Sequence, residues 1–127
     1  SVVVPAVLPV TVDQNGKVYV SNAEIVNHST AAVQVSSVTL TAENGWTLVP
    51  YASDMSHAKV DSNQIGFKIN SAQTSKTGST EQFELTSPWQ IAEEESLTLT
   101  YDAVVSALSQ PVTNANILSV LFVVEWA

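Results

Sequence analysis

The sequence contains no cysteine and no arginine, and each absence excludes a class of site. Without cysteine there is no disulfide framework, no cysteine-bound zinc and no thiol nucleophile. The four basic residues are all lysine and stand against twelve acidic residues, which gives a net charge of -8. We therefore expect no nucleic-acid partner, because phosphate binding needs clustered lysine and arginine. No apolar run reaches the roughly 18 residues that a membrane-spanning helix needs, so we do not expect a transmembrane protein.

What the chain does have is enough apolar residues for a core of its own. It has 127 residues, of which 45% are hydrophobic, and this predicts a single domain over residues 1–127. Only 13% of the residues are charged, so most polarity comes from Ser, Thr, Asn and Gln. This blend is typical of exported bacterial surface proteins, and we expect an extracellular or cell-surface location. The opening at Ser1 lacks the basic start of a signal peptide and favours a mature form whose leader was removed.

Apolar and polar residues alternate with a period of two through most of the chain, which is the pattern of half-buried strands. In the run that begins at Val33 the alternation changes phase at Ser36-Ser37, which predicts a β-bulge. The run from Ile117 to Trp126 is apolar on both faces and predicts a central strand. Nine strands are expected in all, at residues 2–12, 17–21, 23–28, 32–42, 46–51, 64–70, 81–86, 97–106 and 116–126.

Turn signals separate these runs at the spacing found in β-sandwiches. The strongest are Asn15-Gly16 and Asn44-Gly45, because both residue types tolerate the positive φ of hairpin turns. Residues 71–80 read as a hairpin loop, and Glu93-Glu94-Glu95 as a charged connection between strands. The chain is therefore expected to be all-β, a two-sheet antiparallel β-sandwich with Greek-key, Ig-like or jelly-roll-like topology.

No catalytic constellation is recognisable, so we do not expect an enzyme, and we expect no cofactor and no transition metal. The two histidines, His28 and His57, are expected in solvated loops without a metal-ligand spacing. Glu81 and Glu84 should point to opposite faces of one strand and cannot act as a carboxylate pair. Residues 13–16 faintly resemble a calcium loop but lack its ligand set, and they read as an ordinary turn. Calcium bridging between acidic loops is left open.

The aromatic residues give two alternatives, core packing and a platform for sugar rings. Trp46 alternates with Leu48 and is expected to point into the core. Trp89, after Ser87-Pro88, and Tyr51 are the candidates for glycan binding, although packing at the core or its rim is the main expectation for them. Asn27 stands in an Asn-x-Ser glycosylation pattern.

The N-terminal segment is apolar throughout and is interrupted by Pro5 and Pro9, which suits an edge strand. One interpretation is a first strand that bends as it crosses between the sheets of its own domain. The other is an edge or donor strand, residues 1–12, that completes the sheet of a neighbouring subunit. The residues expected to carry this self-association are Val2, Val3, Val4, Val7, Leu8 and Val10.

Nearly the whole chain resembles a module found in secreted and surface proteins of Gram-positive bacteria, mainly clostridial relatives. The segments that carry the likeness are IVNHSTAAVQV and NGWTLVPY. Trp46-Thr47-Leu48 is also similar to the first signature of the WxL cell-wall-binding domains, which carry a second Trp-x-Leu near the C-terminus. Here the corresponding residues are Trp126-Ala127. The resemblance implies an exported β-sandwich.

Two functions are consistent with these features. The first is a non-enzymatic extracellular structural module of a bacterial cell surface, a self-associating fibre or pilus-like subunit whose partner is a second copy of itself. The alternative is a module that binds peptidoglycan or another cell-wall carbohydrate through the exposed aromatic rings.

Overall fold

A computed structural model describes residues 2–6, 10–12, 17–20, 23–110 and 116–127, and throughout these ranges the regular structure is β. The strands in chain order are β1 (Val2–Ala6), β2 (Val10–Val12), β3 (Val18–Val20), β4 (Glu24–Val26), β5 (Val33–Ala42), β6 (Thr47–Leu48), β7 (Gln64–Ile69), β8 (Ala72–Gln73), β9 (Thr80–Ile91), β10 (Ser96–Thr98), β11 (Tyr101–Val105) and β12 (Leu118–Trp126). The predicted all-β sandwich fold is confirmed. Each of the nine expected ranges contains a strand; two of them divide, and β8 lies inside the expected loop 71–80.

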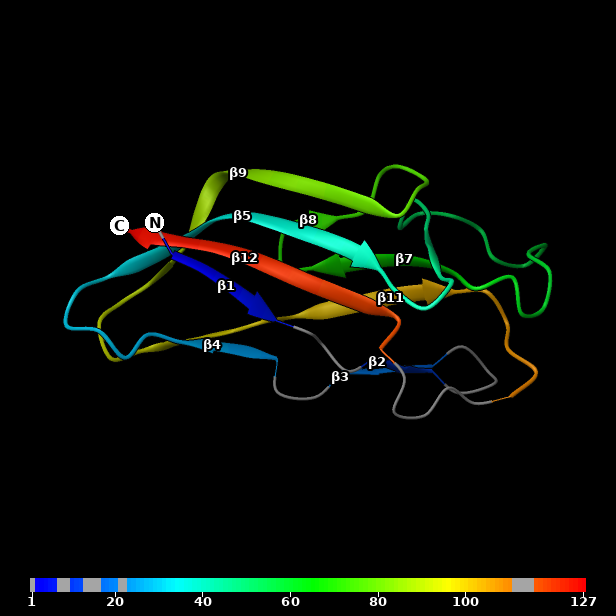
Figure 1. The fold of residues 1–127 in the computed structure, drawn as a ribbon, viewed down its shortest axis with the longest axis horizontal. Helices are drawn as coiled ribbons and strands as arrows, with labels where there is room; N and C mark the ends of the chain where they lie inside the picture. Colours follow the sequence, from blue (N-terminus) through cyan, green and yellow to red (C-terminus); the bar gives the residue numbers. More distant parts are fainter. Residues whose placement is uncertain (1, 7–9, 13–16, 21–22, 111–115) are drawn as a thin grey trace.

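The first sheet has the order β1-β12-β5-β9, with every neighbouring pair antiparallel. Figure 1 shows these four strands side by side, with the two chain ends close together at one end of the sheet. β12 lies between β1 and β5, so the central strand predicted from its doubly apolar sequence is confirmed.

The other strands form the second layer as three separate groups, one of four strands and two of two strands. β11, β7 and β6 form one sheet in that order, and β8 also pairs with β7. β10 pairs with β4, and β2 pairs with β3. The hydroxyl of Tyr101 donates to the carbonyl of Val20 at 3.1 Å and accepts from the amide of Val20 at 3.0 Å, which ties β11 to β3.

The core lies between the two layers and is built by the expected alternation. From the first sheet come Val38 and Leu40 of β5 and Phe122 of β12, and from the second come Phe67 and Ile69 of β7; all five are buried. Because side chains alternate across a strand, the residues between these positions, Thr39 of β5 and Lys68 of β7, face away from the core. Burial of this apolar surface is the main force that holds the layers together.

The predicted bulge in β5 is confirmed at Ser36-Ser37. Val123 pairs with Ser37 and Val124 pairs with Val35, so Ser36 is an extra residue on the β5 side. The insertion restores the alternation, because Val35 before it and Val38 after it are both fully buried.

The turn at Asn44-Gly45 forms with positive φ at both residues, 54° and 83°, and Trp46 N donates to the Glu43 carbonyl at 3.1 Å. It differs from the expected hairpin, since β5 belongs to the first sheet and β6 to the second. β6 then pairs with β7 in parallel, an exception in an otherwise antiparallel fold. Segment 49–63 is long enough to make this crossover, which a tight hairpin cannot. The other strong turn, Asn15-Gly16, lies outside the described residues.

Candidate functional site

The N-terminal segment pairs within its own chain, as the first interpretation of it expected. β1 joins the edge of the first sheet, with Val2 opposite Val124 and Ala6 opposite Val120. β2 then belongs to the second layer, where Val10 pairs with Val20 and is almost completely buried. Val10 is therefore a core residue of this chain. Val7 and Leu8 lie outside the described residues.

β1 is an edge strand of the first sheet within the part of the chain that the structure describes. Among the described strands, its only partner is β12. Its sequence, VVVPA, contains no charged or polar side chain. Edge strands in soluble proteins usually carry lysine or another charge that discourages pairing with a second chain. In β1 the one residue that discourages such pairing is Pro5, because it lacks the N–H that a neighbouring strand would bind.

The opposite edge of the sheet is β9, and its pairing with β5 is interrupted. Glu84 pairs with Ser37 and Trp89 pairs with Val35, so residues 85–88 stand opposite the single residue Ser36. Thr80 to Glu84 form an unbroken ladder of five positions before this interruption. Like β1, β9 has one strand partner within the described residues. Both edges of the first sheet are therefore strands with one side that no other described strand pairs with.

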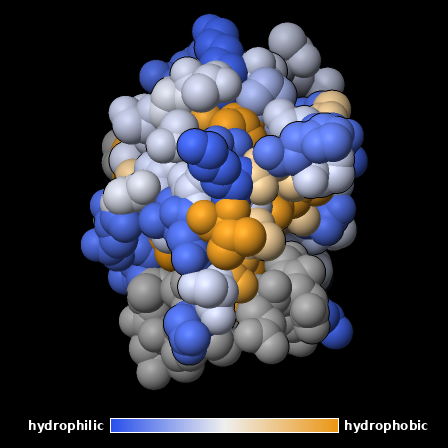
Figure 2. All heavy atoms as spheres, turned by 90° about the vertical axis from the view of Figure 1, so that its right-hand side faces the viewer, coloured by the Kyte–Doolittle hydropathy of each residue, from blue (hydrophilic) through white to orange (hydrophobic). Residues whose placement is uncertain are grey.

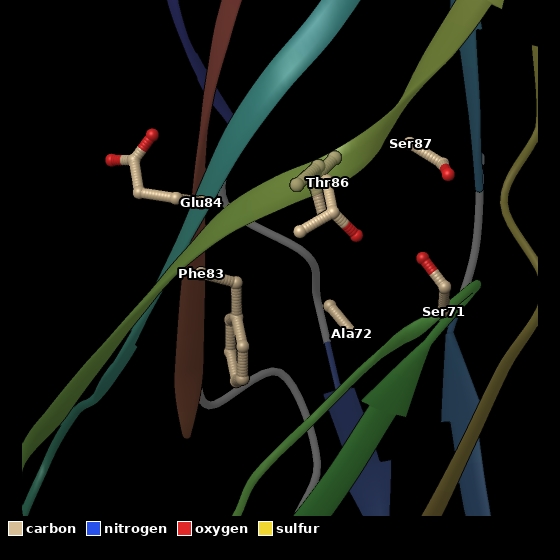
Figure 3. A pocket seen from close by; sticks show the side chains of 7 residues that line it. Ser71, Ala72, Phe83, Glu84, Thr86 and Ser87 are labelled. Atoms are coloured by element: carbon tan, nitrogen blue, oxygen red, sulfur yellow. The ribbon is translucent and has the colours of Figure 1, made fainter.

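A hollow of about 300 Å³ lies beneath the β9 edge, between β9 and β8. Figure 3 shows Phe83 and Ala72 facing it from opposite layers, the hydroxyls of Ser71 and Ser87 above them, and Glu84 turned away. Phe83 and Leu85 are only half-buried, although both pack against the core. The hollow is the place where the two layers of the sandwich are open to solvent along β9.

Trp89 lies beside this opening and is half-buried. Its indole Nε1 donates to Ser71 Oγ at 3.0 Å, and its ring packs on Phe122 with centroids 6.4 Å apart. The indole thus connects β9 to the core and to the residue before β8. This agrees with the expected packing of Trp89 at the rim of the core.

Tyr51 occupies a different environment, on segment 49–63. Its hydroxyl donates to the carboxylate of Asp102 on β11. This hydrogen bond, with desolvation and the charge of the carboxylate, raises the pKa of the Tyr51 phenol above its usual value. Among the described residues, no hydrogen bond or ring contact joins Tyr51 to Trp89. The two aromatic residues proposed for glycan binding have separate neighbours and separate partners.

Trp46 and Leu48, the apolar residues of the WxL-like triplet, are both buried, at 8% and 1% exposure. The prediction that Trp46 is a core residue is confirmed. In this chain the triplet packs between the layers, and Thr47 between them is half-exposed.

Three polar side chains hold the loops in place, a role that the sequence did not predict for any of them. Asn27 is buried, and its Nδ2 donates to the carbonyls of Ala31, Ile91 and Ala92 at 2.9 to 3.1 Å. Its Oδ1 accepts from the amide and hydroxyl of Ser29. The glycosylation-like pattern is therefore an Asx turn whose amide faces inward.

Thr74 and Glu81 do the same for the loop between β8 and β9. The Thr74 hydroxyl accepts from Phe67 N at 3.0 Å and donates to the Val49 carbonyl at 2.7 Å. The Glu81 carboxylate, which is buried, accepts from the amides of Ser75 and Lys76 and from the Ser75 hydroxyl. Glu84, three residues later, is exposed, as the alternation predicted.

The remaining acid–base candidates lie apart. His28 and His57 are exposed in loops, and Glu93-Glu94-Glu95 forms the turn between β9 and β10. Within the described ranges, no group of three or more His, Asp or Glu side chains is placed to hold a metal ion. The same ranges contain no helix long and apolar enough to cross a membrane. Residues 13–16, the calcium-like turn, lie outside them.

Comparison with known proteins gives no match among family models, curated proteins or solved structures.

Proposed function

We propose that this chain is a non-enzymatic structural module of a bacterial cell surface that associates with copies of itself through the open edges of its first sheet. The observation that carries the proposal is β1, an edge strand with one partner among the described strands and no charged side chain. Such an edge is a template for pairing with a further strand. An extracellular location is supported by the sequence, with no arginine and few charges.

The geometry supports this function better than glycan binding. A sugar platform needs an aromatic ring with one face open to solvent. The Trp89 ring packs on Phe122 and its N–H is used by Ser71, and Tyr51 donates its hydroxyl to Asp102. The Trp89 ring is therefore committed to packing within the molecule, and the Tyr51 hydroxyl is already used by Asp102.

A second apolar surface lies at the end of the sandwich where segment 49–63 loops out (Figure 1). Figure 2 views this end and shows apolar surface in its centre between hydrophilic side chains. Val60, in that segment, is 59% exposed. A lysine at Val60 therefore tests whether contacts at this end of the sandwich, rather than contacts at the sheet edges, cause association.

The test is sedimentation of the purified protein over a range of concentrations, together with electron microscopy. Wild type is expected to form oligomers that grow with concentration. Val3→Lys puts a charge on the β1 edge and should leave a folded monomer. Val26→Lys, on β4, and Val60→Lys are the matched controls and should assemble like wild type.

Edge substitution is preferable to removal of residues 1–12, because that deletion also removes Val10 and Val12, which are buried in the core. Wild-type protein that stays monomeric at every concentration would contradict the proposal. Retention of that monomer on insoluble peptidoglycan would favour the glycan-binding function instead.

A further inference from the structure

We propose that the β9 edge accepts the β1 edge of a second copy, so that the first sheet continues from subunit to subunit. This inference rests on the self-association proposed above and names its acceptor. The partner is a second copy of this chain, and the acceptor comprises Thr80 to Glu84 with the hollow beneath them.

Strand direction favours this pairing. β1 is antiparallel to β12, β12 to β5, and β5 to β9. β1 and β5 therefore run one way, and β12 and β9 run the other way. When a second copy continues the sheet in the same orientation, its β1 lies antiparallel to β9, and the alternation of the sheet is preserved.

The lengths of the two edges also agree. β1 has five residues, Val2–Ala6. The regular part of β9 has five positions in its ladder with β5, from Thr80 to Glu84, before the interruption at residues 85–88. Pairing between subunits would end where the bulge turns β9 out of register. A bulge at an edge is a common device for terminating pairing.

The hollow contains apolar side chains that an added strand would cover. Phe83 and Leu85 face the space between β9 and β8 and are only half-buried. A strand placed beside β9 would close this side of the sandwich and remove their apolar surface from water, which stabilises the contact. An apolar segment such as β1 is the suitable occupant, because it introduces no charge into the opening.

Charge disfavours the symmetric alternative in which two β9 edges meet. That pairing would add an exposed Glu84 from each copy to one continuous sheet, in a chain whose net charge is already -8. Repulsion between two strands that each carry an acidic side chain and no basic one disfavours their approach. Pairing of β9 with uncharged β1 avoids this repulsion. Because it joins two different edges, the contact does not close on itself and produces an open-ended assembly.

The experiment uses two variants, each of which is blocked at one of the two edges. Val3→Lys blocks β1, and Leu85→Lys places a charge in the hollow beneath β9. Each variant alone should sediment as a monomer. Mixed in equal amounts they should form a dimer of one copy each and nothing larger, because one intact β1 meets one intact β9. Melting curves establish that both variants are folded, and Thr86→Lys, at an exposed position lining the same hollow, replaces Leu85→Lys if that variant does not fold.

The outcomes separate this inference from the proposed function. If wild type is monomeric, self-association itself fails, and the inference fails with it. If the folded β9 variant assembles like wild type, self-association stands and β9 is not the acceptor. If that variant forms dimers on its own that grow no further, β1 pairs with β1, and the inference is overturned.

Cysteine cross-linking gives an independent readout, since the natural chain has no cysteine. Val4→Cys mixed in turn with Gln82→Cys, Phe83→Cys and Glu84→Cys should give a disulfide-linked heterodimer in at least one mixture, because strand pairing brings Cβ atoms within disulfide reach. Homodimers of Val4→Cys alone, with no heterodimer in any mixture, would contradict β1–β9 pairing.

Discussion

The side-chain amide of Asn27 donates to the main-chain carbonyl of Ile91 across 64 positions of sequence, at 3.1 Å. It thereby fixes the loop before β5 to the end of β9. The same amide group donates to Ala92, and the Asn27 carbonyl oxygen accepts from Ser29. One buried side chain thus satisfies polar groups from two loops at once.

Asn27→Ala should lower the free energy of unfolding by about 1–3 kcal/mol, because it leaves buried carbonyls without a donor. Urea denaturation measures the change. His28→Ala is the matched control, since His28 is exposed in the same loop, and it should stay within about 0.5 kcal/mol of wild type. An Asn27 variant as stable as wild type would show that water replaces the amide.

Gly66 permits the close crossing of segment 49–63 over β7. A Cβ at this position would stand 2.8 Å from the Pro50 carbonyl oxygen and from Tyr51 Cα. Gly66→Ala should therefore destabilise the fold by about 1–3 kcal/mol or more, the usual cost of overpacking.

Gly78→Ala is the control for that substitution, because a Cβ at Gly78 meets nothing within 4 Å. Thermal melting of the two variants compares them directly. Equal melting temperatures would mean that Pro50 and Tyr51 can move away from β7 at little cost.

Trp46→Ala should cost about 3–5 kcal/mol, the range for deletion of a large buried aromatic side chain. Trp126→Ala removes the same side chain from a position that is 63% exposed, and it should have a much smaller effect. Guanidinium denaturation followed by circular dichroism measures both. A Trp46 variant that kept its stability but lost binding to a glycan would contradict the core assignment.

The Tyr51 phenol has a raised pKa because it donates to the Asp102 carboxylate. The contribution of this contact to stability is fully present below the pKa of an unfolded tyrosine, about 10, and is lost as the pH rises through the higher folded value. Asp102→Ala should bring the Tyr51 pKa down toward its ordinary value.

The ultraviolet absorbance of tyrosinate follows this titration. Subtracting the curve of Tyr51→Phe from that of wild type isolates Tyr51 from the other two tyrosines. A Tyr51 curve that does not move when Asp102 is replaced would contradict the assigned cause.

The sequence predicted the features that depend on alternation along one strand. The two-layer fold, the bulge at Ser36-Ser37, the central position of residues 117–126 and the burial of Trp46 all follow from which residues face inward. Polar networks were missed, because Thr74 and Glu81 act through partners that only the fold brings near. The Asn-x-Ser pattern at Asn27 was the one available signal, since such residues favour Asx turns.

The alternation of apolar and polar residues also did not predict how the strands are connected. Asn44-Gly45 predicts a turn with positive φ whether or not the next strand joins the same sheet. The parallel pairing of β6 with β7 arises because segment 49–63 leads the chain back over Gly66 to the start of β7, in the same sheet. The short β8 pairs with β7 directly after it. Such pairings depend on where a long connection leads, and local alternation contains no information on that.

The position of β12 has a consequence for how the protein is made. β12 is needed by both β1 and β5, yet it follows every other described strand in the chain. During synthesis, β1 must wait for residues more than one hundred positions later before it finds its partner, as the pairing of Val2 with Val124 shows. Folds built on such distant pairings form slowly. Until β12 leaves the ribosome, the apolar β1 stays unpaired and is a segment for chaperones to protect.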